Sequence, residues 1–287
     1  MPTVYLNGSY LPEEEALIPV MDRGFLFGDG VYEVIPVYGR RLFRLAQHLQ
    51  RLQNSLDAIR IVNPLQESAW TEVLEEIVCR NDGDDQAVYL QVTRGPAARR
   101  DHSFPDQPQP TVFVMSTPVT TAGTETGTAG ITAITLPDTR WQFCNIKAIT
   151  LLPNVLLRQQ AVDAGTAEAI LIRDGLATEG AASNLFITRD GSLITPPNGP
   201  TLLPGITRDL ILELARKNDI PCREEDIPQP ELRDADEVWL TSSTREISPV
   251  TRIDDRPVGD GNPGPVWRRM IDLYQEYKEA VRRGEAV

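Results

Sequence analysis

The chain has 287 residues, of which 41% are hydrophobic, so it can form one large or two medium domains with a substantial buried core. Its formal net charge of −13 argues against a general nucleic-acid binder and against docking on an anionic membrane, because both need a basic surface. No apolar run approaches the roughly 18 residues of a membrane span, and we expect no secretory signal. The three widely spaced cysteines, Cys79, Cys144 and Cys222, disfavour a disulfide framework or a metal site and fit a reducing cytoplasm.

The first part of the chain predicts an antiparallel sheet with two helices. Strands are expected at residues 3–6, 31–38, 88–93 and 111–115, where β-rich stretches are bounded by turn residues such as Asn7-Gly8 and Gly39-Arg40. Helices are expected at residues 45–59 and 67–81, where apolar residues recur at three- and four-residue steps. Arg51 lies off the apolar stripe of the first helix, so it can face a different surface.

Residues 117–130 are rich in Thr, Gly and Pro, which is typical of a linker. We therefore expect an N-terminal α+β domain at residues 1–120 and a second domain at residues 121–287.

The second part mixes strands and helices. Strands are expected at residues 130–136, 169–172, 185–188 and 238–241, and helices at 154–164, 208–218 and 266–282. Thr207 is a suitable N-cap for the middle helix. This order predicts an α/β or α+β domain with a barrel-like or open sheet.

Lys147 lies in a quiet segment, as the only basic residue between Arg140 and Arg158. A lysine in such a place usually packs its stem on the surface and keeps its amine in water. The alternative is a partly desolvated amine that forms a Schiff base with an aldehyde. Lys147 alone does not decide between the two.

Three downstream blocks bear on this choice. They are Glu-Gly-Ala-Ala-Ser-Asn-Leu-Phe at residues 179–186, Leu-Pro-Gly-Ile-Thr-Arg at 203–208 and Leu-Thr-Ser-Ser-Thr-Arg-Glu at 240–246. Together they resemble the signature of the class IV aminotransferases, the fold-type IV enzymes that use pyridoxal 5′-phosphate. The resemblance extends from Asp22 to about Pro249. It implies a smaller N-terminal α+β sandwich domain and a larger C-terminal barrel-like domain, with the cofactor between them.

The resemblance also implies roles for single residues. Lys147 matches the lysine that forms the Schiff base and then carries a proton as general base and acid. Glu179 matches the carboxylate that keeps the pyridine nitrogen protonated, so that the ring accepts electrons more readily. A helix start offers N–H donors and a positive dipole end to the cofactor phosphate. The expected cofactor-binding residues, besides Lys147 and Glu179, are Arg51, Gly205, Ile206, Thr207, Ser242 and Ser243.

The loop after residue 93 bears on the substrate. Arg100 and His102, two residues apart, resemble the substrate-carboxylate trap of the D-amino-acid transaminases, which is completed by a tyrosine that matches Tyr32. Arg99 stands beside Arg100, and the two-residue step to His102 favours Arg100. In relatives the Arg and His come from the neighbouring subunit, which implies a homodimer.

The resulting expectation is a cytoplasmic enzyme that transfers an amino group between D-amino acids such as D-alanine and 2-oxo acids such as 2-oxoglutarate. The reaction would be ping-pong through the Lys147 Schiff base. The alternatives on the same fold are a branched-chain L-amino-acid transaminase and an aminodeoxychorismate lyase. A binding protein that kept the fold is a further alternative.

Overall fold

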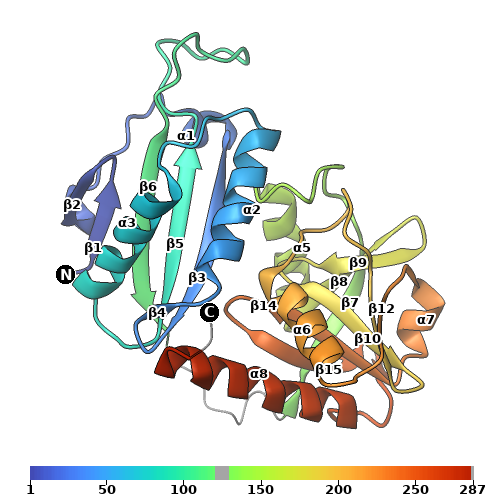
Figure 1. Cartoon of the computed structure of the whole chain (residues 1–287). Helices are drawn as coiled ribbons and strands as arrows, with labels where there is room; N and C mark the ends of the chain where they lie inside the picture. Colours follow the sequence, from blue (N-terminus) through green and yellow to red (C-terminus); the bar gives the residue numbers. More distant parts are fainter. Residues whose placement is uncertain (120–128, 286–287) are drawn as a thin grey trace. The chain divides into compact units, whose positions relative to one another are not determined.

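The computed structural model describes residues 1–119 and 129–285 (Figure 1). The chain divides into two compact units. Unit 1 comprises Met1–Thr120, Ile146–Leu151 and Glu279–Val287, and unit 2 comprises Thr121–Asn145 and Leu152–Lys278. The expected domain boundary between residues 120 and 121 lies outside the described residues.

Unit 1 contains a six-stranded sheet in the order β2-β1-β6-β5-β3-β4. All neighbouring strands are antiparallel. The strands are β1 Thr3–Leu6, β2 Ser9–Pro12, β3 Gly30–Tyr38, β4 Arg41–Leu42, β5 Gln86–Thr93 and β6 Thr111–Pro118. The sequence predicted four of these strands and the hairpin turn between β3 and β4, and it placed the end of β6 in the linker.

The helices of unit 1 are α1 Arg23–Phe27, α2 Leu45–Ala58 and α3 Glu67–Arg80, besides the short 3-10 helix η1 Glu13–Glu15. Helices α2 and α3 pack on the same apolar core of the sheet (Figure 1). Leu52, Leu56 and Leu74 contribute to this core from the helices, and Ile35 and Leu90 contribute from the sheet. Both helices thus follow the apolar periodicity of the sequence.

Tyr32 and Glu33, neighbours in β3, point to opposite faces of the sheet. Val31, Glu33 and Ile35 are buried, and Glu33 bonds to residues of α2. Successive side chains of a strand point to opposite faces, so Tyr32 faces away from α2.

A short segment far along the chain also belongs to unit 1. Residues Ile146–Leu151 return to β3 and form an antiparallel bridge between Ala148 and Val31. The Ile149 N–H donates to the Gly30 carbonyl at 3.0 Å. This pairing places Lys147 at the start of β3.

Unit 2 is built around a closed barrel. Its sheet runs β12-β11-β10-β14-β15-β7-β8-β9-β13, and β10 also pairs with β9. The strands from β10 to β9 therefore close a ring of six, in which β7 is parallel to both its neighbours. This confirms the barrel-like expectation. The strands are β7 Ile131–Pro137, β8 Glu168–Arg173, β9 Leu176–Gly180, β10 Asn184–Arg189, β11 Ser192–Thr195, β12 Cys222–Glu224, β13 Ile227–Pro228, β14 Glu237–Ser242, β15 Glu246–Ile253 and β16 Arg256–Pro257.

The remaining helices are α5 Leu152–Asp163, α6 Ile206–Lys217, α7 Gln229–Arg233 and α8 Pro265–Arg283. One expectation was wrong at the start of α6. Gly205, not Thr207, is the N-cap, with φ −77° and ψ 130°, and Thr207 lies inside the first turn. The reason is tertiary, because a Cβ at position 205 would meet Asn184 Oδ1 at 1.9 Å and only glycine allows this approach.

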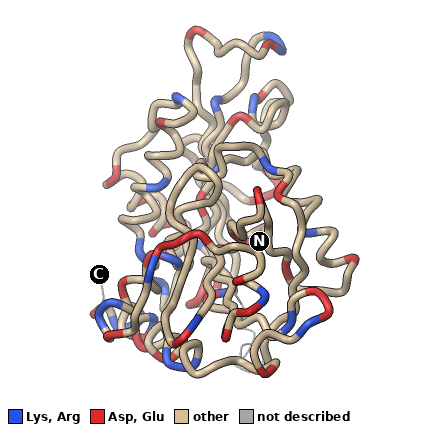
Figure 2. The backbone as a smooth tube through the Cα atoms, turned by 90° about the vertical axis from the view of Figure 1, so that its right-hand side faces the viewer, with Lys and Arg blue, Asp and Glu red and all other residues tan. Residues whose placement is uncertain are grey.

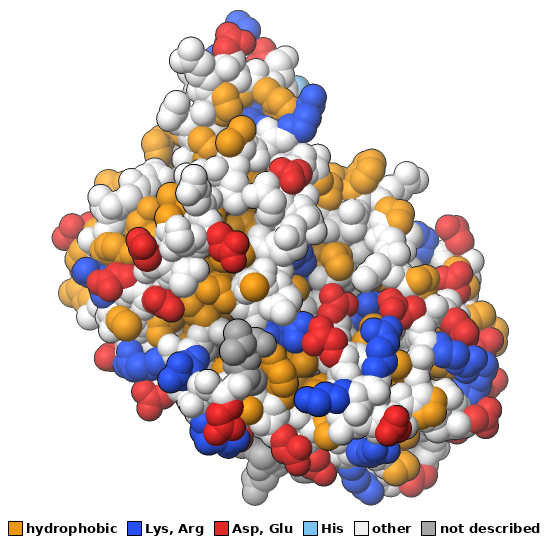
Figure 3. All heavy atoms as spheres, viewed as in Figure 1, with side chains coloured by type: hydrophobic (Ala, Val, Ile, Leu, Met, Phe, Trp, Pro, Cys, Tyr) orange, Lys and Arg blue, Asp and Glu red, His pale blue; other side chains and the backbone are white. Residues whose placement is uncertain are grey.

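Charges are interspersed along the chain. Figure 2 shows acidic and basic residues distributed over the whole backbone trace. On the face shown in Figure 3, side chains of opposite sign lie next to one another. Within residues 1–119 and 129–285, no helix is both long enough and apolar enough to cross a membrane.

Gly95 generates a prediction about the loop that follows β5. Its φ is +84°, and a Cβ there would meet the Gln109 carbonyl oxygen at 1.7 Å. Gly95→Ala should therefore cost about 3 kcal/mol of unfolding free energy, from backbone strain plus a clash with main chain that cannot move aside. Gly8→Ala is the matched control, because Gly8 has φ +95° but open space. It should cost only about 1 kcal/mol. If urea unfolding gave the same loss of unfolding free energy for Gly95→Ala and Gly8→Ala, the prediction of a clash at Gly95 would be wrong.

Candidate functional site

Lys147 is held by its main chain. Its N–H donates to Ser55 Oγ at 3.2 Å, and its carbonyl accepts the Tyr32 N–H at 3.0 Å. The Nζ of its side chain lies 4.1 Å from the centroid of the Tyr32 ring. The ring face attracts the ammonium and fixes its direction.

Tyr32 is itself supported by a second ring. Tyr89 stacks on it at 5.7 Å between centroids. Burial, and to a smaller extent Tyr32, raises the pKa of Tyr89 to about 12, so Tyr89 stays a neutral phenol. Its hydroxyl donates to Gln91 Oε1 at 2.7 Å.

A buried charge cluster fills the other face of β3. Arg51 donates to both oxygens of Glu33, from Nε at 2.8 Å and from Nη2 at 2.7 Å. His48 Nδ1 lies 2.8 Å from Glu33 Oε2. Burial alone would raise the pKa of Glu33, but the charge and hydrogen bonds of Arg51, helped by His48, lower it to about 2. Glu33 therefore holds the Arg51 guanidinium in one fixed plane.

His48 completes this cluster as a neutral ring. Burial lowers its pKa, against the opposing effect of Glu33. With Nδ1–H given to Glu33, Nε2 carries a lone pair, and this buried atom has no hydrogen-bond partner in the part of the chain that the structure describes. The phosphate contact expected of Arg51 stays a prediction.

Arg100 and His102 lie together on the exposed loop after β5. The Arg100 guanidinium lies 4.9 Å from the centroid of the Phe27 ring, and the His102 ring lies 5.3 Å from it. Arg99 instead points to solvent, 85% exposed, and pairs with Asp101 at 3.5 Å. Among the described residues, no hydrogen bond or ring contact joins this pair to Tyr32.

Glu179 is buried in β9 of unit 2. Arg140 Nη1 donates to Oε1 at 2.5 Å, while Asn184 Nδ2 and the Leu203 N–H donate to Oε2 at 3.1 Å each. Burial raises the pKa of Glu179, and the Arg140 charge opposes this. The carboxylate is thus fixed in orientation and sensitive to the charge beside it.

The sequence did not reveal Arg140 and its partner Asp138. Arg140 donates to Asp138 from Nε and Nη2, both at 2.9 Å, and Arg173 pairs with the same carboxylate at 2.9 Å. Two arginines and two carboxylates therefore form one buried network. The only sequence signal was the triplet Asp138-Thr139-Arg140 directly after a strand, and it does not indicate Glu179 as the partner.

The start of α6 provides N–H donors for an anion. No side chain caps this helix, and Ile206 and Thr207 in its first turn are buried. The first N–H groups of a helix have no partner within it. Asn184 connects Glu179 to the segment that leads into α6. Its amide donates to Glu179 and also to the Leu203 carbonyl, the latter at 2.8 Å. These donors fit a phosphate group.

Ser242 and Ser243 lie at the turn between β14 and β15, which pair as far as Ser242 and Glu246. Ser242 Oγ accepts the Arg245 N–H at 3.2 Å, so this hydroxyl also stabilises the turn. The adjacent Thr241 hydroxyl is buried without a hydrogen-bond partner among residues 1–119 and 129–285. The turn therefore retains hydroxyl groups able to bind a ligand.

The expected site residues fall into two sets. Unit 1 holds Lys147, Tyr32, Arg51, Arg100 and His102, and unit 2 holds Glu179, Gly205, Ile206, Thr207, Ser242 and Ser243. Within units, the structure brings Lys147 to Tyr32, Arg100 and His102 each to Phe27, and Glu179 to the 203–205 turn. Their assembly into one site stays a prediction.

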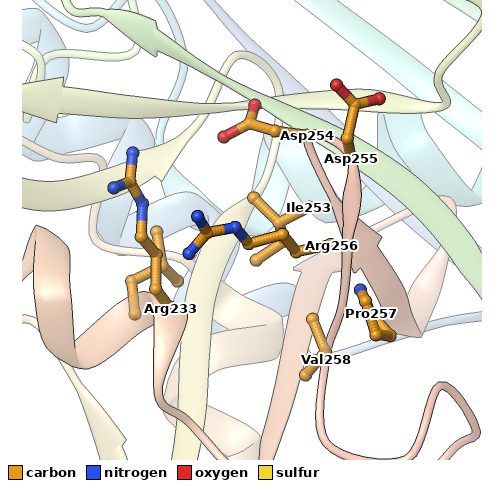
Figure 4. A pocket seen from close by; sticks show the side chains of 8 residues that line it. Arg233, Ile253, Asp254, Asp255, Arg256, Pro257 and Val258 are labelled. Carbon is orange, nitrogen blue, oxygen red and sulfur yellow. The ribbon is translucent and has the colours of Figure 1, made fainter.

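One pocket of unit 2 lies outside both sets. It has a volume of about 210 Å³ and is lined by α7 and the β15–β16 hairpin (Figure 4). Arg233 and Arg256 are its cationic side chains, and both are exposed, as are Asp254 and Asp255. It contains no expected site residue.

The Glu33 cluster predicts a pH dependence. Because the pKa of Glu33 is lowered from 4.5 to about 2, its stabilisation is complete above pH 4.5 and is lost as the pH falls toward 2. Glu33→Gln should therefore destabilise the protein at pH 7 by on the order of 3 kcal/mol, and the difference from wild type should shrink between pH 4.5 and 3.

Urea unfolding at several pH values measures this difference. The matched control is Glu76→Gln, whose ion pair with Arg80 is nearly half exposed on both sides. It should change stability by less than about 1 kcal/mol. A Glu33→Gln difference that stays constant with pH would contradict the assigned pKa.

Comparisons with known proteins identify the family of this chain. The family model Amino-transferase class IV matches residues 30–253. The D-alanine aminotransferase of Bacillus licheniformis is 40% identical over 272 residues, which cover 95% of each chain. That of Listeria monocytogenes is 39% identical and covers 99% of this chain and 98% of its own.

Solved structures of aminotransferases superpose closely on this chain. A branched-chain amino acid aminotransferase from T.th., solved with pyridoxamine 5′-phosphate, superposes with a TM-score of 0.90 at 29% identity, covering 99% of this chain and 96% of that one. The Escherichia coli branched-chain enzyme gives 0.89 at 28% identity, covering 100% and 96%. The chain belongs to the class IV aminotransferase family.

Proposed function

We propose that this protein transfers amino groups between D-amino acids and 2-oxo acids in a ping-pong cycle with pyridoxal 5′-phosphate. D-Alanine and 2-oxoglutarate are the representative pair. The observation that carries the proposal is that Arg100 and His102 both contact the Phe27 ring, where they offer a cationic and a hydrogen-bonding group to a carboxylate. Curated relatives that are 36–40% identical over nearly the whole chain carry the name D-alanine aminotransferase.

The cofactor, when bound, supplies an aldehyde for the amino group and a ring that takes up the electrons of the broken Cα–H bond. Lys147 holds the aldehyde carbon between turnovers and moves the proton to and from the substrate Cα. Its main chain is fixed, so only the side chain moves during this transfer.

Glu179 holds a proton at the ring nitrogen. This requires the ionised form of Glu179, which burial disfavours and Arg140 favours. Ile206 and Thr207 bind the phosphate through the first turn of α6, with the hydroxyl groups of Ser242 and Ser243 and the Arg51 guanidinium as further donors.

Tyr32, Arg100 and His102 orient the substrate through its carboxylate. A fixed carboxylate directs the Cα–H toward the lysine amine and so determines which enantiomer reacts. Arg100 is favoured over Arg99, because Arg99 is 85% exposed and already pairs with Asp101.

We propose a cytoplasmic homodimer as the active form. Arg100 and His102 are exposed on the single chain, as residues that complete a neighbouring subunit's site would be. Helix α5 exposes Leu152, Val155, Leu156 and Val162, between 49% and 69% each, at helical spacing along one face. Apolar surface of this kind favours association. The three free thiols fit a reducing compartment.

The alternative on the same fold is a branched-chain L-amino-acid transaminase, the name carried by several solved neighbours at 27–29% identity. The higher identity to D-alanine aminotransferases and the Arg100–His102 pair favour the D-specific function. An aminodeoxychorismate lyase would eliminate pyruvate rather than transfer the amino group.

An assay of D-alanine and L-leucine side by side, each with 2-oxoglutarate, tests the proposal. We expect D-alanine to be converted with a kcat/KM at least about 100-fold higher than that of L-leucine, because the wrong enantiomer points its Cα–H away from the lysine. Lys147→Ala is the control and should remove turnover of both. Turnover of L-leucine alone would overturn the proposal.

The contact between Arg140 and Glu179 leads us to predict a change in the pH dependence of kcat/KM. Without its charge, the pKa of Glu179 should rise further, so the acid limb of kcat/KM should move to higher pH in Arg140→Met. The Kd of the cofactor should rise by about tenfold. Arg173→Met keeps the Arg140–Glu179 contact and serves as the control. An unshifted acid limb in Arg140→Met would contradict this role.

A further inference from the structure

Three consecutive carbonyl groups of the substrate loop converge on one buried guanidinium. Arg23 is 4% exposed. Its Nη1 donates to the carbonyls of Asp101 at 2.6 Å and Ser103 at 3.2 Å, and its Nη2 donates to that of His102 at 3.3 Å. Carbonyls of an exposed loop usually bond to water, whereas here a charged donor fixes the main chain on both sides of His102.

Asp29 holds Arg23 in place. Its Oδ2 accepts from Arg23 Nε at 2.7 Å and from Arg94 Nε at 2.8 Å, while its Oδ1 accepts from Arg94 Nη2 at 2.9 Å. Burial would raise the pKa of Asp29, but hydrogen bonds from Arg94 and Arg23 lower it. The carboxylate is therefore charged at neutral pH and fixes the plane of both guanidinium groups.

Arg94 connects this pair to α2 and to the end of the loop. It donates to the carbonyls of Ile59 at 2.8 Å and Arg60 at 3.2 Å, just after the helix. Its guanidinium lies 3.7 Å from the centroid of the Phe104 ring. The loop is thus attached to the body of unit 1 through both arginines.

The Arg100 and His102 side chains contact the same phenylalanine ring as Arg23. Phe27, at the end of α1, lies 4.9 Å from the Arg23 guanidinium, 4.9 Å from that of Arg100 and 5.3 Å from the His102 ring, between centres. The main chain of this loop is thus bonded to Arg23, and the Arg100 and His102 side chains both contact Phe27, so Arg23 and Phe27 restrict where the two side chains can lie.

We propose that Arg23 is a positioning residue for the substrate carboxylate. It does not touch the substrate, but its guanidinium holds the 101–103 main chain so that Arg100 and His102 face one carboxylate together. A lysine could not replace it, because Nε binds Asp29 while both Nη atoms reach the carbonyls. This inference rests on the proposed D-amino-acid transaminase function.

Arg23→Met in the holoenzyme tests the inference. We expect the KM for D-alanine and the inhibition constant of propionate, a carboxylate without an amino group, to rise by about tenfold. The kcat and the cofactor Kd should stay within about twofold, because neither Lys147 nor the phosphate site is touched. Arg80→Met is the matched control, since Arg80 also lies over a ring, that of Tyr10, and pairs with Glu76. It should leave all four constants unchanged.

A double-mutant cycle separates positioning from a general loss of stability. If Arg23 acts through the loop, Arg23→Met together with Arg100→Ala should raise the KM by less than the product of the two single effects. If Arg23→Met does not fold, Arg23→Lys replaces it in the cycle, because the lysine keeps a positive charge beside Asp29.

An unchanged KM in the Arg23 variant, or effects that multiply, would overturn the inference and leave the proposed function intact. An unchanged KM in Arg100→Ala would instead overturn the proposed carboxylate site. The two failures are therefore distinguishable.

Discussion

The return of residues 146–151 to β3 is the constraint on which the position of Lys147 depends. The Val31–Ala148 bridge and the main-chain bonds of Tyr32 and Ile149 fix this segment, together with the bond from the Lys147 N–H to Ser55 Oγ. The fit is close, since a Cβ on Gly30 would lie 2.6 Å from the Val92 carbonyl and 3.0 Å from Ile149 Cδ1. Backbone bonds provide the position, so the Lys147 side chain is not needed to hold the segment and can take the role proposed for it.

Arginine compensates two buried carboxylates, Glu33 and Glu179, in different ways. Glu33 accepts two hydrogen bonds from Arg51 and a third from His48, and these lower its pKa. Glu179 receives one contact from Arg140, which also serves Asp138, and its pKa is raised by burial. The first arrangement fixes a structural charge, whereas the second leaves a carboxylate whose ionisation responds to its partner, which fits the role proposed for Glu179.

Neighbouring residues of β3 serve different purposes because a strand alternates its faces. Tyr32 lies beside the lysine amine, while Glu33 points toward α2 and orders Arg51. A one-residue change of register would exchange these environments. The antiparallel pairing with β5, continuous from Gly30 to Val37, prevents this.

The sequence by itself determined the periodic elements and the identity of the family. The α2 and α3 helices and most of the long strands follow from local apolar spacing, and Lys147, Glu179 and the 205–207 turn follow from motif blocks that stay intact along the chain. The eight-residue strand β15 was not predicted. The short strands β9 and β11 to β13 were not predicted either, because their pairing with other strands, not their composition, makes them strands. Only the tertiary structure decided that Gly205 caps α6, that Arg140 holds Glu179, and that Arg23 and Asp29 support the loop of Arg100. Each of these contacts joins residues separated by many positions, and a buried charge or a close approach becomes visible only when the fold brings its partner to it.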